Sequence, residues 1–320
     1  MSTSACEVDV LSCLPGLECP IAPEVHAQAE SAHERTIAWL CATGLAPTLR
    51  HVTRLRAARV GWLVARGFPR ARAWALQLAS DWTALFCLLD DHVEAIASAG
   101  AVEARLAGLL AAFDAAAGPD GDPLAAALAD LRRRMDRLAP ARWVDRFRAR
   151  LGELFACFTA EAGFRERGAP PALAAYLALR EVSVGLHVLF TFTALTEAID
   201  LPAEVLAHPA IASLERRASN VVGWANDILT YEKEVAQGEV LNMVVVLQAA
   251  HGHAPREALA RVIARHNAEV QAFLAEAAAL PSFGEHDAAV ARHVAVLRAW
   301  IPGHLAWGVE TGRYRPRAGE

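Results

Sequence analysis

The chain has 320 residues, 54% hydrophobic and 21% charged, which is enough to bury a sizeable core as one large domain or two smaller ones. A formal net charge of −5 gives no case for nucleic-acid binding. We find no apolar run of the roughly 18 residues that a membrane span needs, and no basic region followed by an apolar core, as in a secretion signal. The expected setting is therefore a soluble protein of the cytoplasm.

The sequence predicts an all-α protein, because alanine is abundant and alternating strand patterns are scarce. Residues 1–22 are expected to form an irregular segment, 23–315 a single helical domain and 316–320 a tail. Glycine and proline mark the breaks between the helices. The helices are expected at 24–43, 47–66, 70–98, 102–117, 123–138, 141–167, 171–198, 209–237, 240–251, 255–279, 284–300 and 302–310.

The six cysteines form two groups. Three of them occur in apolar helical stretches and are predicted to be buried free thiols: Cys41, Cys87 and Cys157. The other three lie near the N-terminus and lack the matching His or Cys partners of a zinc site: Cys6, Cys13 and Cys19.

Acidic residues cluster near the end of the helix expected at 70–98. Asp90, Asp91 and Glu94 follow an apolar run over 85–89. Asp90 and Glu94 are four residues apart and share one helix face. Buried carboxylates so close together need a compensating cation. Taken alone, the segment is explained equally well as an exposed acidic turn.

The helix expected at 171–198 is almost wholly apolar in its second half, which indicates burial. Arg180 on such a helix requires an anionic partner, unless its side chain reaches the helix end. Gly185 costs about 1 kcal/mol in a helix interior and indicates a break or a close approach; Ser183 and Val184 are equally open as the position of the bend. His187 lies on the same face as Arg180 and is best explained as a core histidine.

The helix expected at 209–237 ends beside Gly238, a residue that tolerates a left-handed cap. Within it, Asn226, Thr230 and Glu234 follow one another at intervals of four residues, so their side chains line one stripe. An amide oxygen, a hydroxyl and a carboxylate together suit a hard cation such as Mg²⁺. A solvated polar face is the alternative for this stripe on its own.

Taken together, these segments resemble the bacterial class I terpene synthases, or terpene cyclases. Asp90-Asp91-His92-Val93-Glu94 resembles the aspartate-rich motif of that family. The segment 226–234 resembles its second metal motif, N-D-x-x-S/T-x-x-(K/R)-E. Arg180 stands 46 residues before Asn226, at the spacing of the family's diphosphate-sensing arginine.

The chain end adds Arg313-Tyr314, which is similar to the family's terminal Arg-Tyr pair. The resemblance covers about residues 24 to 315. Two positions depart from the commonest pattern, since Glu94 replaces Asp and Thr230 replaces Ser, but both keep the ligand atoms. The resemblance implies a single-domain helical bundle around a central active-site cavity.

The resemblance also implies an activity, the Mg²⁺-dependent ionisation and cyclisation of a linear prenyl diphosphate. Farnesyl diphosphate is the expected substrate and a sesquiterpene hydrocarbon or alcohol the expected product, although the sequence does not fix the chain length as C10, C15 or C20. Three Mg²⁺ ions are expected, with Mn²⁺ as a substitute, and a homodimer is the default assembly.

The resemblance assigns roles to individual residues. Asp90 would bridge two metal ions, with Asp91 and Glu94 as direct or water-mediated partners. The third ion would bind to Asn226, Thr230 and Glu234. Four residues would bind the diphosphate: Arg180, Lys233, Arg313 and Tyr314. Arg180 and Asp90 are the expected catalytic residues, whereas Lys233 on sequence alone is also explained as a surface lysine.

Cyclisation also needs an apolar cavity in which aromatic faces stabilise a carbocation. Phe86, Phe190 and Trp307 are the candidates, although each is also explained as ordinary core. The terminal Arg313-Tyr314 pair follows Gly312 in an expected loop that would close over the bound substrate.

Other functions fit the motifs less well. A prenyl-elongating synthase would need a second aspartate-rich motif where this chain has Asn226-Asp227-x-x-Thr230. A di-iron bundle would need paired E-x-x-H motifs, and only Glu30-Ser31-Ala32-His33 has that pattern. A helical protein without catalytic activity would leave the coexistence of the ordered motifs unexplained.

Overall fold

The computed structural model describes residues 16–314, and the predictions for 1–15 and 315–320 lie outside the described residues. Within the described part, every regular element is a helix. The α-helices are α2 (Ala29–Ala42), α3 (Leu49–Ala58), α4 (Val60–Gly67), α5 (Ala73–Glu94), α6 (Ala99–Ala115), α7 (Pro123–Leu138), α8 (Ala141–Arg167), α9 (Leu173–Ser183), α10 (Leu186–Thr191), α11 (Thr193–Thr196), α12 (Ala203–Leu206), α13 (Pro209–Ala236), α14 (Met243–His251), α15 (Pro255–Ala278) and α16 (Asp287–Glu310). A short 3₁₀ helix, η2 (Gly284–His286), precedes α16.

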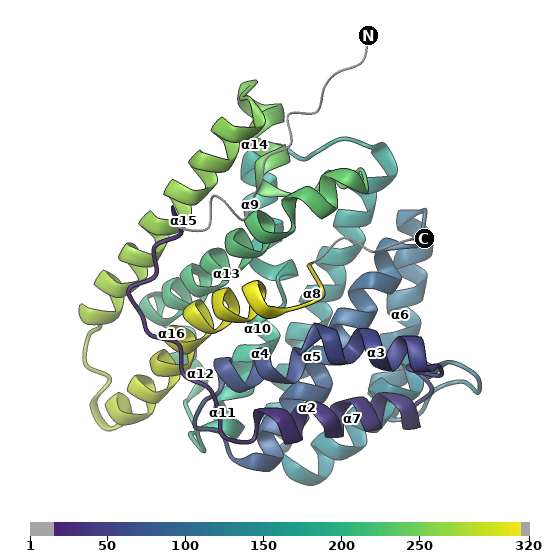
Figure 1. Cartoon of the computed structure of the whole chain (residues 1–320). Helices are drawn as coiled ribbons and strands as arrows, with labels where there is room; N and C mark the ends of the chain where they lie inside the picture. The colour runs from purple at the N-terminus through teal and green to yellow at the C-terminus, as the bar shows by residue number, and fades with distance from the viewer. Residues whose placement is uncertain (1–15, 315–320) are drawn as a thin grey trace.

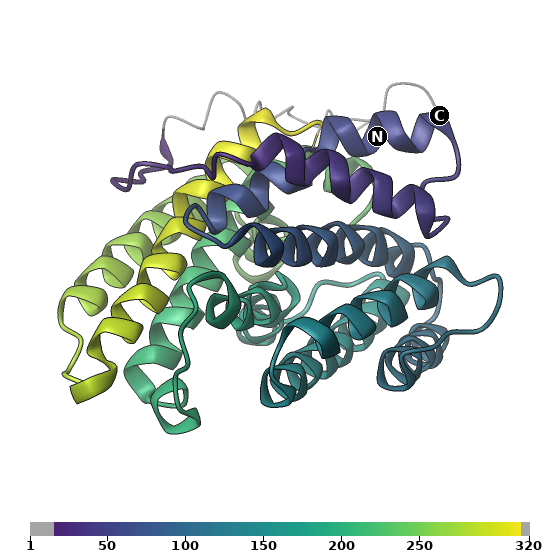
Figure 2. The same cartoon turned by 90° about the horizontal axis from the view of Figure 1, so that it is seen from below.

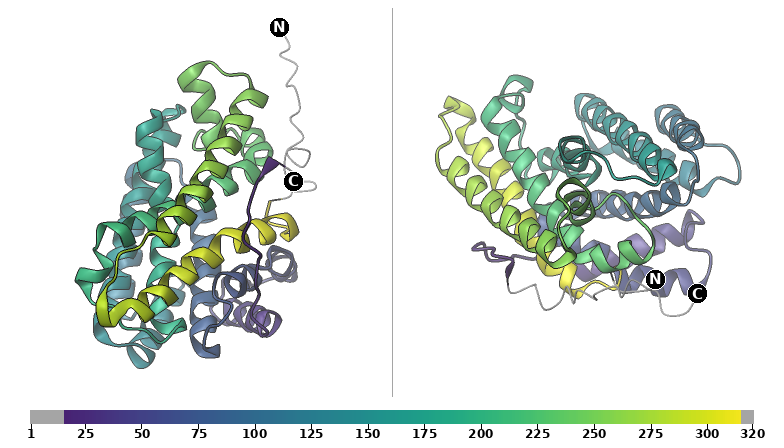
Figure 3. Two further views of the ribbon diagram at one scale, coloured as in Figure 1. Left: turned by 90° about the vertical axis from the view of Figure 1, so that its left-hand side faces the viewer. Right: turned by 90° about the horizontal axis from the view of Figure 1, so that it is seen from above.

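The helices form two groups that meet at α5. Figure 1 shows α13, α15 and α16 on one side of the molecule and α6 and α8 on the other. The view from below separates the same two groups, with α5 between them (Figure 2). Figure 3 shows α16 crossing beside the N-terminal helices, and α16 packs directly on α4 and α13. The two motif-bearing helices, α5 and α13, thus lie in the interior of the bundle.

The core contains a large apolar cluster centred on aromatic rings. Phe147 packs edge-on to Trp82 at 5.1 Å and to Phe192 at 5.8 Å, and lies nearly parallel to Trp143 at 5.5 Å. These rings come from α5, α8 and the segment between α10 and α11, so they join elements that are distant in sequence. Burial of large side chains contributes about 1.5–3 kcal/mol each, and this cluster therefore fixes the position of α5.

The helix expected at 47–66 is interrupted, which corrects the sequence prediction. Arg59 has a φ of 50° and separates α3 from α4. The break leaves backbone carbonyls available: Trp307 Nε1 donates to Ala58 O at 2.9 Å and Thr311 Oγ1 donates to the same oxygen at 2.8 Å. These bonds anchor the end of α16, a long-range arrangement that local sequence does not encode.

The helix expected at 171–198 is also divided, into α9, α10 and α11. Gly185 has a φ of 80°, and a Cβ there would lie 2.8 Å from the Phe86 ring. Gly185 is therefore the break that the sequence left open. The segment 173–196 is long and apolar enough to cross a membrane by length and composition alone, which contradicts the sequence prediction that no apolar stretch is long enough for a span. In the structure, 44% of the most apolar 18-residue window of this segment is buried.

Two further expectations need correction. The break between 284–300 and 302–310 does not occur, because α16 continues through Pro302. Packing of α16 on α4 and α13 offsets the roughly 3 kcal/mol cost of an interior proline; next to Pro302, Trp300 packs edge-on to Phe68 at 5.4 Å. Of the three cysteines predicted to be buried, Cys157 is buried, Cys87 is only partly buried and Cys41 is exposed; all three are free thiols, as is Cys19.

Candidate functional site

The first acidic cluster lies on the last turn and a half of α5. Leu85 and Leu89 anchor this part of the helix in the core. Asp90 and Asp91 are partly exposed, at 31% and 29% of their side-chain surface, and Glu94 is exposed at 45%. Burial and the adjacent Asp91 raise the pKa of Asp90, and Arg313 opposes that rise. The cluster thus presents carboxylates at the inner edge of a cavity.

The second motif lies on α13. Thr230 Oγ1 donates to the main-chain oxygen of Asn226 at 2.8 Å, which directs the hydroxyl along the helix. Glu234 Oε2 accepts from Asn242 Nδ2 at 2.9 Å. Burial raises the pKa of Glu234 to about 7, with Asp227 adding to the rise. A carboxylate with a raised pKa gains from a nearby cation, which favours its charged form.

The two motifs face the same space. A cavity of about 460 Å³ is lined by residues of both. They are Asp90, Asp91 and Glu94 from α5, and Asn226, Thr230, Lys233 and Glu234 from α13. A smaller recess of about 60 Å³ brings Arg180 to Asp90, Asn226 and Glu234. The side chains that the sequence picked out at long separations therefore converge in space.

Arg180 lies in a network of buried polar groups. Its guanidinium donates to Asn226 Oδ1 at 2.5 Å and forms an ion pair with Asp227 Oδ1 at 2.8 Å. The Tyr176 hydroxyl donates to Asp227 Oδ2, and the Met243 backbone N–H donates to the same oxygen at 3.1 Å. Asp227 is only 1% exposed, so this network fixes both the carboxylate and the arginine that it holds.

Arg313 and Tyr314 join the two motifs across the cavity. Arg313 Nη1 lies 2.9 Å from Asp91 Oδ2, and its Nη2 lies 3.4 Å from Asp90 Oδ2. The Tyr314 hydroxyl accepts from Asn226 Nδ2 at 2.6 Å. One residue of the pair thus contacts α5 and the next contacts α13.

Gly312 determines where this pair lies. Its N–H donates to Ala57 O at 2.8 Å. A Cβ at Gly312 would lie 2.9 Å from Ala57 Cβ, so only glycine allows the approach without a shift. The chain end is therefore tied to the break between α3 and α4.

The three aromatic candidates occupy different places. Phe86 is half-buried and stacks on Phe158 at 6.1 Å. Phe190 lines a separate cavity of about 50 Å³ beside Glu215, so its position gives no support to a role at the metal motifs. Trp307 is buried and packs edge-on to Tyr314 at 5.2 Å, which places it behind the terminal pair.

Sequence reasoning missed several polar residues of the site. Arg165 of α8 donates to Glu239 Oε2 at 2.9 Å and lies 3.5 Å from Glu161 Oε2. Both carboxylates and Arg165 line the recess with Asp90. Asn242 links Glu234 to the main-chain oxygen of Asp227. No local motif marks these residues, because folding alone brings α8 and the loop after α13 to α5.

The oxygen atoms that line this cavity suit a hard cation that also binds water and phosphate oxygens. Among residues 16–314, no three His, Cys, Asp or Glu side chains converge closely enough to hold a metal ion by themselves. Mg²⁺ commonly takes only one or two carboxylates and fills its remaining positions with water and phosphate oxygens. Carboxylate, amide and hydroxyl oxygens on opposite walls of one cavity fit that mode of binding.

Comparison with known proteins identifies the family. The model described as terpene synthase family 2, C-terminal metal binding, matches residues 81–272, which is more than half of the chain. The farnesyl diphosphate-cyclizing (+)-T-muurolol synthase of Roseiflexus castenholzii is 33% identical over 303 residues, covering 93% of this chain and 92% of that protein. The chain belongs to the terpene synthases. It is thus a lyase of the cyclase class, and the metal-binding description of the matched model indicates that it uses a divalent metal.

Other relatives of this terpene synthase agree. The (+)-eremophilene synthase of Sorangium cellulosum is 30% identical over 308 residues, covering 93% of this chain and 92% of that one. Among solved structures, a single-substitution variant of cucumene synthase superposes with a TM-score of 0.80 at 28% identity, covering 93% of this chain and 100% of that chain. Hedycaryol synthase in complex with HEPES gives 0.78 at 26% identity, with coverages of 91% and 96%. The expected terpenoid synthase fold is confirmed.

Proposed function

We propose that this terpene synthase cyclises farnesyl diphosphate to a sesquiterpene hydrocarbon or alcohol and releases diphosphate. Two observations support the substrate. The (+)-T-muurolol synthase and the 4-epi-cubebol synthase of Streptosporangium roseum are both named as farnesyl diphosphate-cyclizing. The observation that carries the reaction is the shared cavity of Asp90 and Glu234, with Arg180 in the adjoining recess.

The proposed metal is Mg²⁺, in three ions, with Mn²⁺ as a substitute. Asp90 would hold ions at the α5 wall, assisted by Asp91 and Glu94, and Asn226, Thr230 and Glu234 would hold an ion at the α13 wall. When bound, the ions supply positive charge that stabilises the departing diphosphate.

Four side chains of the protein would bind the diphosphate oxygens. Arg180, Lys233 and Arg313 would donate charge-assisted hydrogen bonds, and the Tyr314 hydroxyl would donate one more. In the structure Arg313 holds Asp91 and Tyr314 holds Asn226. Substrate binding would therefore exchange these contacts for contacts to phosphate, with the chain end remaining anchored through Gly312.

The hydrocarbon chain requires an apolar wall that excludes water. Phe86 is the best placed of the three proposed aromatic residues, since it lies one turn before Asp90 and contacts the backbone break at Gly185. Phe190 and Trp307 remain proposals for the same role. Cation–π attraction would stabilise passing positive charge by about 0.5–2 kcal/mol per ring.

The decisive experiment is incubation of the purified protein with geranyl, farnesyl and geranylgeranyl diphosphate and Mg²⁺, followed by gas chromatography and mass spectrometry. We expect a cyclic C15 product from farnesyl diphosphate, and none when the metal is chelated. Conversion of only the C10 or only the C20 substrate would refute the proposed C15 chain length of the substrate. No turnover of any of the three would refute the proposed activity.

We also propose that residues 23–315 form one domain, that the protein resides in the cytoplasm and that it assembles as a homodimer. Sedimentation equilibrium of the purified protein tests the assembly, because a monomer at micromolar concentration would exclude a stable dimer.

A further inference from the structure

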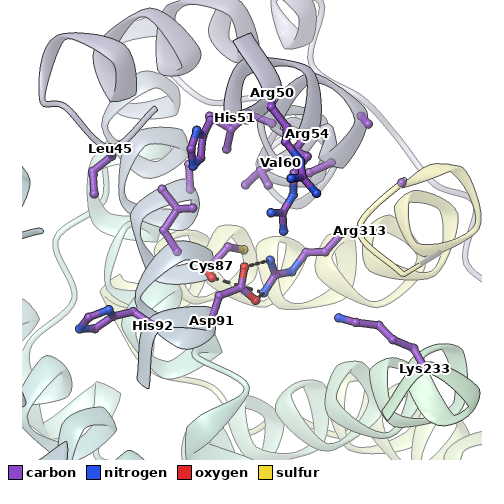
Figure 4. A pocket seen from close by; sticks show the side chains of 16 residues that line it. Leu45, Arg50, His51, Arg54, Val60, Cys87, Asp91, His92, Lys233 and Arg313 are labelled. Atoms are coloured by element: carbon purple, nitrogen blue, oxygen red, sulfur yellow. Dashed lines mark hydrogen bonds and ion pairs between the residues drawn. The ribbon is translucent and has the colours of Figure 1, made fainter. Parts of the chain in front are cut away.

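A second and larger cavity adjoins the metal-motif cavity. It measures about 560 Å³ and lies between α3, α5 and the chain end. Figure 4 shows Arg50 and Arg54 reaching into it from α3, Lys233 from α13 on the opposite side, and Arg313 between them. Asp91, Lys233 and Arg313 line both cavities, so the two spaces meet at these three side chains.

The two cavities have opposite charge. Among residues 16–314, four Arg and Lys side chains line the larger one, and Asp91 is the only carboxylate that does so. The metal-motif cavity has five carboxylates against three such cations. Arg313 is paired with Asp91, whereas Arg54 and Lys233 form no ion pair with any carboxylate of residues 16–314. Arg54 and Lys233 therefore offer the larger cavity positive charge that no carboxylate in the described part of the chain neutralises.

One wall of this cavity is apolar. Leu55 of α3 and Leu88 of α5 are half-buried and face it, together with Leu45 from the connection before α3. These leucines pack on one side against the small buried cluster of Leu40, Ala46, Val60 and Ala84, but none of the three is fully buried, so part of their apolar surface faces the cavity. Cations beside an apolar wall match a ligand that has an anionic head and a hydrocarbon tail.

We propose that this cavity is a metal-independent receiving site for a prenyl diphosphate. The diphosphate would lie against Arg54, Lys233 and Arg313, and the isoprenoid chain would lie against Leu55 and Leu88. The proposal rests on the proposed function only for the chemical class of this ligand. A volume of about 560 Å³ lies within the range of pockets that enclose small organic ligands.

Electrostatics gives the reason for a separate receiving site. Without metal ions, the five carboxylates of the metal-motif cavity repel a diphosphate, while the adjacent cationic cavity attracts it and increases the rate of capture. Because Lys233 and Arg313 line both spaces, the head group can pass from one to the other while it keeps contact with the same two cations.

The test measures binding in EDTA, with farnesyl S-thiolodiphosphate as a probe that resists ionisation. Arg54→Gln is compared with Arg56→Gln, because Arg56 lies on the same helix but pairs with Glu34 outside the cavity. Loss of one charge-assisted contact predicts an increase in Kd of about tenfold for Arg54→Gln. For Arg56→Gln we expect a change of less than about twofold.

The apolar wall is tested in the same way. Leu55→Ala is compared with Leu49→Ala, since Leu49 is 78% exposed and does not line the cavity. We expect Kd to rise about threefold for Leu55→Ala only, and inorganic diphosphate to bind at least about tenfold more weakly than the prenyl probe. Circular dichroism confirms that each variant is folded.

Three results would overturn the proposal: equal Kd values for the two Arg variants, equal values for the two Leu variants, or inorganic diphosphate binding as tightly as the prenyl probe. With Mg²⁺ and saturating substrate, Arg54→Gln should retain its kcat and lose kcat/KM. If kcat fell as much as kcat/KM, Arg54 would take part in the chemical step, and this result would also refute a receiving role. Arg54-dependent binding without any turnover would instead refute the proposed function and leave the receiving site standing.

Discussion

Arg313 and Asp91 are 222 residues apart in the chain, yet their side chains form an ion pair of 2.9 Å. This pair draws the chain end onto α5, while the neighbouring Tyr314 draws it onto α13 through Asn226. The Arg313 guanidinium and the Tyr314 hydroxyl therefore already connect the two motif-bearing walls. In the proposed reaction these same two groups would bind the diphosphate instead. Every residue of this arrangement borders one cavity.

Asp90→Asn and Glu234→Gln should each reduce turnover by orders of magnitude and leave the fold intact. The first removes a carboxylate from the α5 wall of the metal-motif cavity, and the second removes one from the α13 wall. Loss of a metal ligand also predicts a higher Mg²⁺ requirement. Product formation against Mg²⁺ concentration measures both effects. Glu232→Gln is a matched control on α13 whose side chain does not line the cavity. Near wild-type turnover with an unchanged Mg²⁺ requirement would reject the metal assignment.

Arg180→Ala should reduce turnover by orders of magnitude, because Arg180 faces the recess shared by both motifs. It should also destabilise the protein by about 3–5 kcal/mol, because it leaves the buried Asp227 carboxylate without its cation. Steady-state kinetics and the melting temperature, measured on the same preparation, separate the two effects. A large drop in melting temperature with retained activity would instead show that Arg180 is structural.

Tyr176→Phe tests how Arg180 is held. The change removes the hydroxyl that donates to Asp227 and leaves that carboxylate with the Met243 N–H and Arg180. We expect a stability loss of about 1–3 kcal/mol and a fall in kcat of about tenfold, since a misplaced arginine stabilises the leaving group less well. Denaturant unfolding and single-turnover rates measure these quantities. A variant with unchanged kcat would show that Arg180 does not depend on this network.

The sequence was sufficient for the helical class and for the motif residues, because their spacing along α5 and α13 already defines which side chains share a face. It was insufficient where distant segments decide the outcome. The break at Arg59 provides carbonyls for Trp307 and Thr311, and Pro302 lies within a helix held by packing against α4. Arg165 and Glu239 belong to no motif and reach the site only through tertiary packing.

Asp81→Ala should destabilise the protein by about 3–5 kcal/mol, because it breaks a buried ion pair and leaves Arg134 with only its longer pair to Asp130, at 3.6 Å. Asp81 is 1% exposed and accepts from Thr36, Gln77 and Arg134 at 2.6, 2.7 and 2.6 Å. Asp136→Ala is the control, since Asp136 forms an exposed pair with Arg132 and should change the unfolding free energy by less than about 1 kcal/mol. Equal urea midpoints for the two variants would contradict the buried-pair argument.

The last prediction concerns His304, which packs beside Tyr314 with its Nε2 3.1 Å from the hydroxyl. Burial lowers its pKa to about 3, and the nearby Arg180 and His266 add to the effect. In the unfolded chain the same histidine takes up a proton near a pH of about 6.5. Because the unfolded state then binds more protons than the native state, the unfolding free energy should fall as pH falls from about 6.5 toward 3, with a slope of up to about 1.4 kcal/mol per pH unit.

His304→Gln keeps a polar side chain that can hydrogen-bond to Tyr314 and removes this titration, so its urea-unfolding free energy should fall less steeply between about pH 7 and pH 5 than that of the wild type. Part of the slope should remain, because burial also lowers the pKa of His33 and His266. Identical slopes for variant and wild type would mean that the native protein protonates His304 as readily as the unfolded chain does. The neutral, buried imidazole behind Tyr314 would then be excluded.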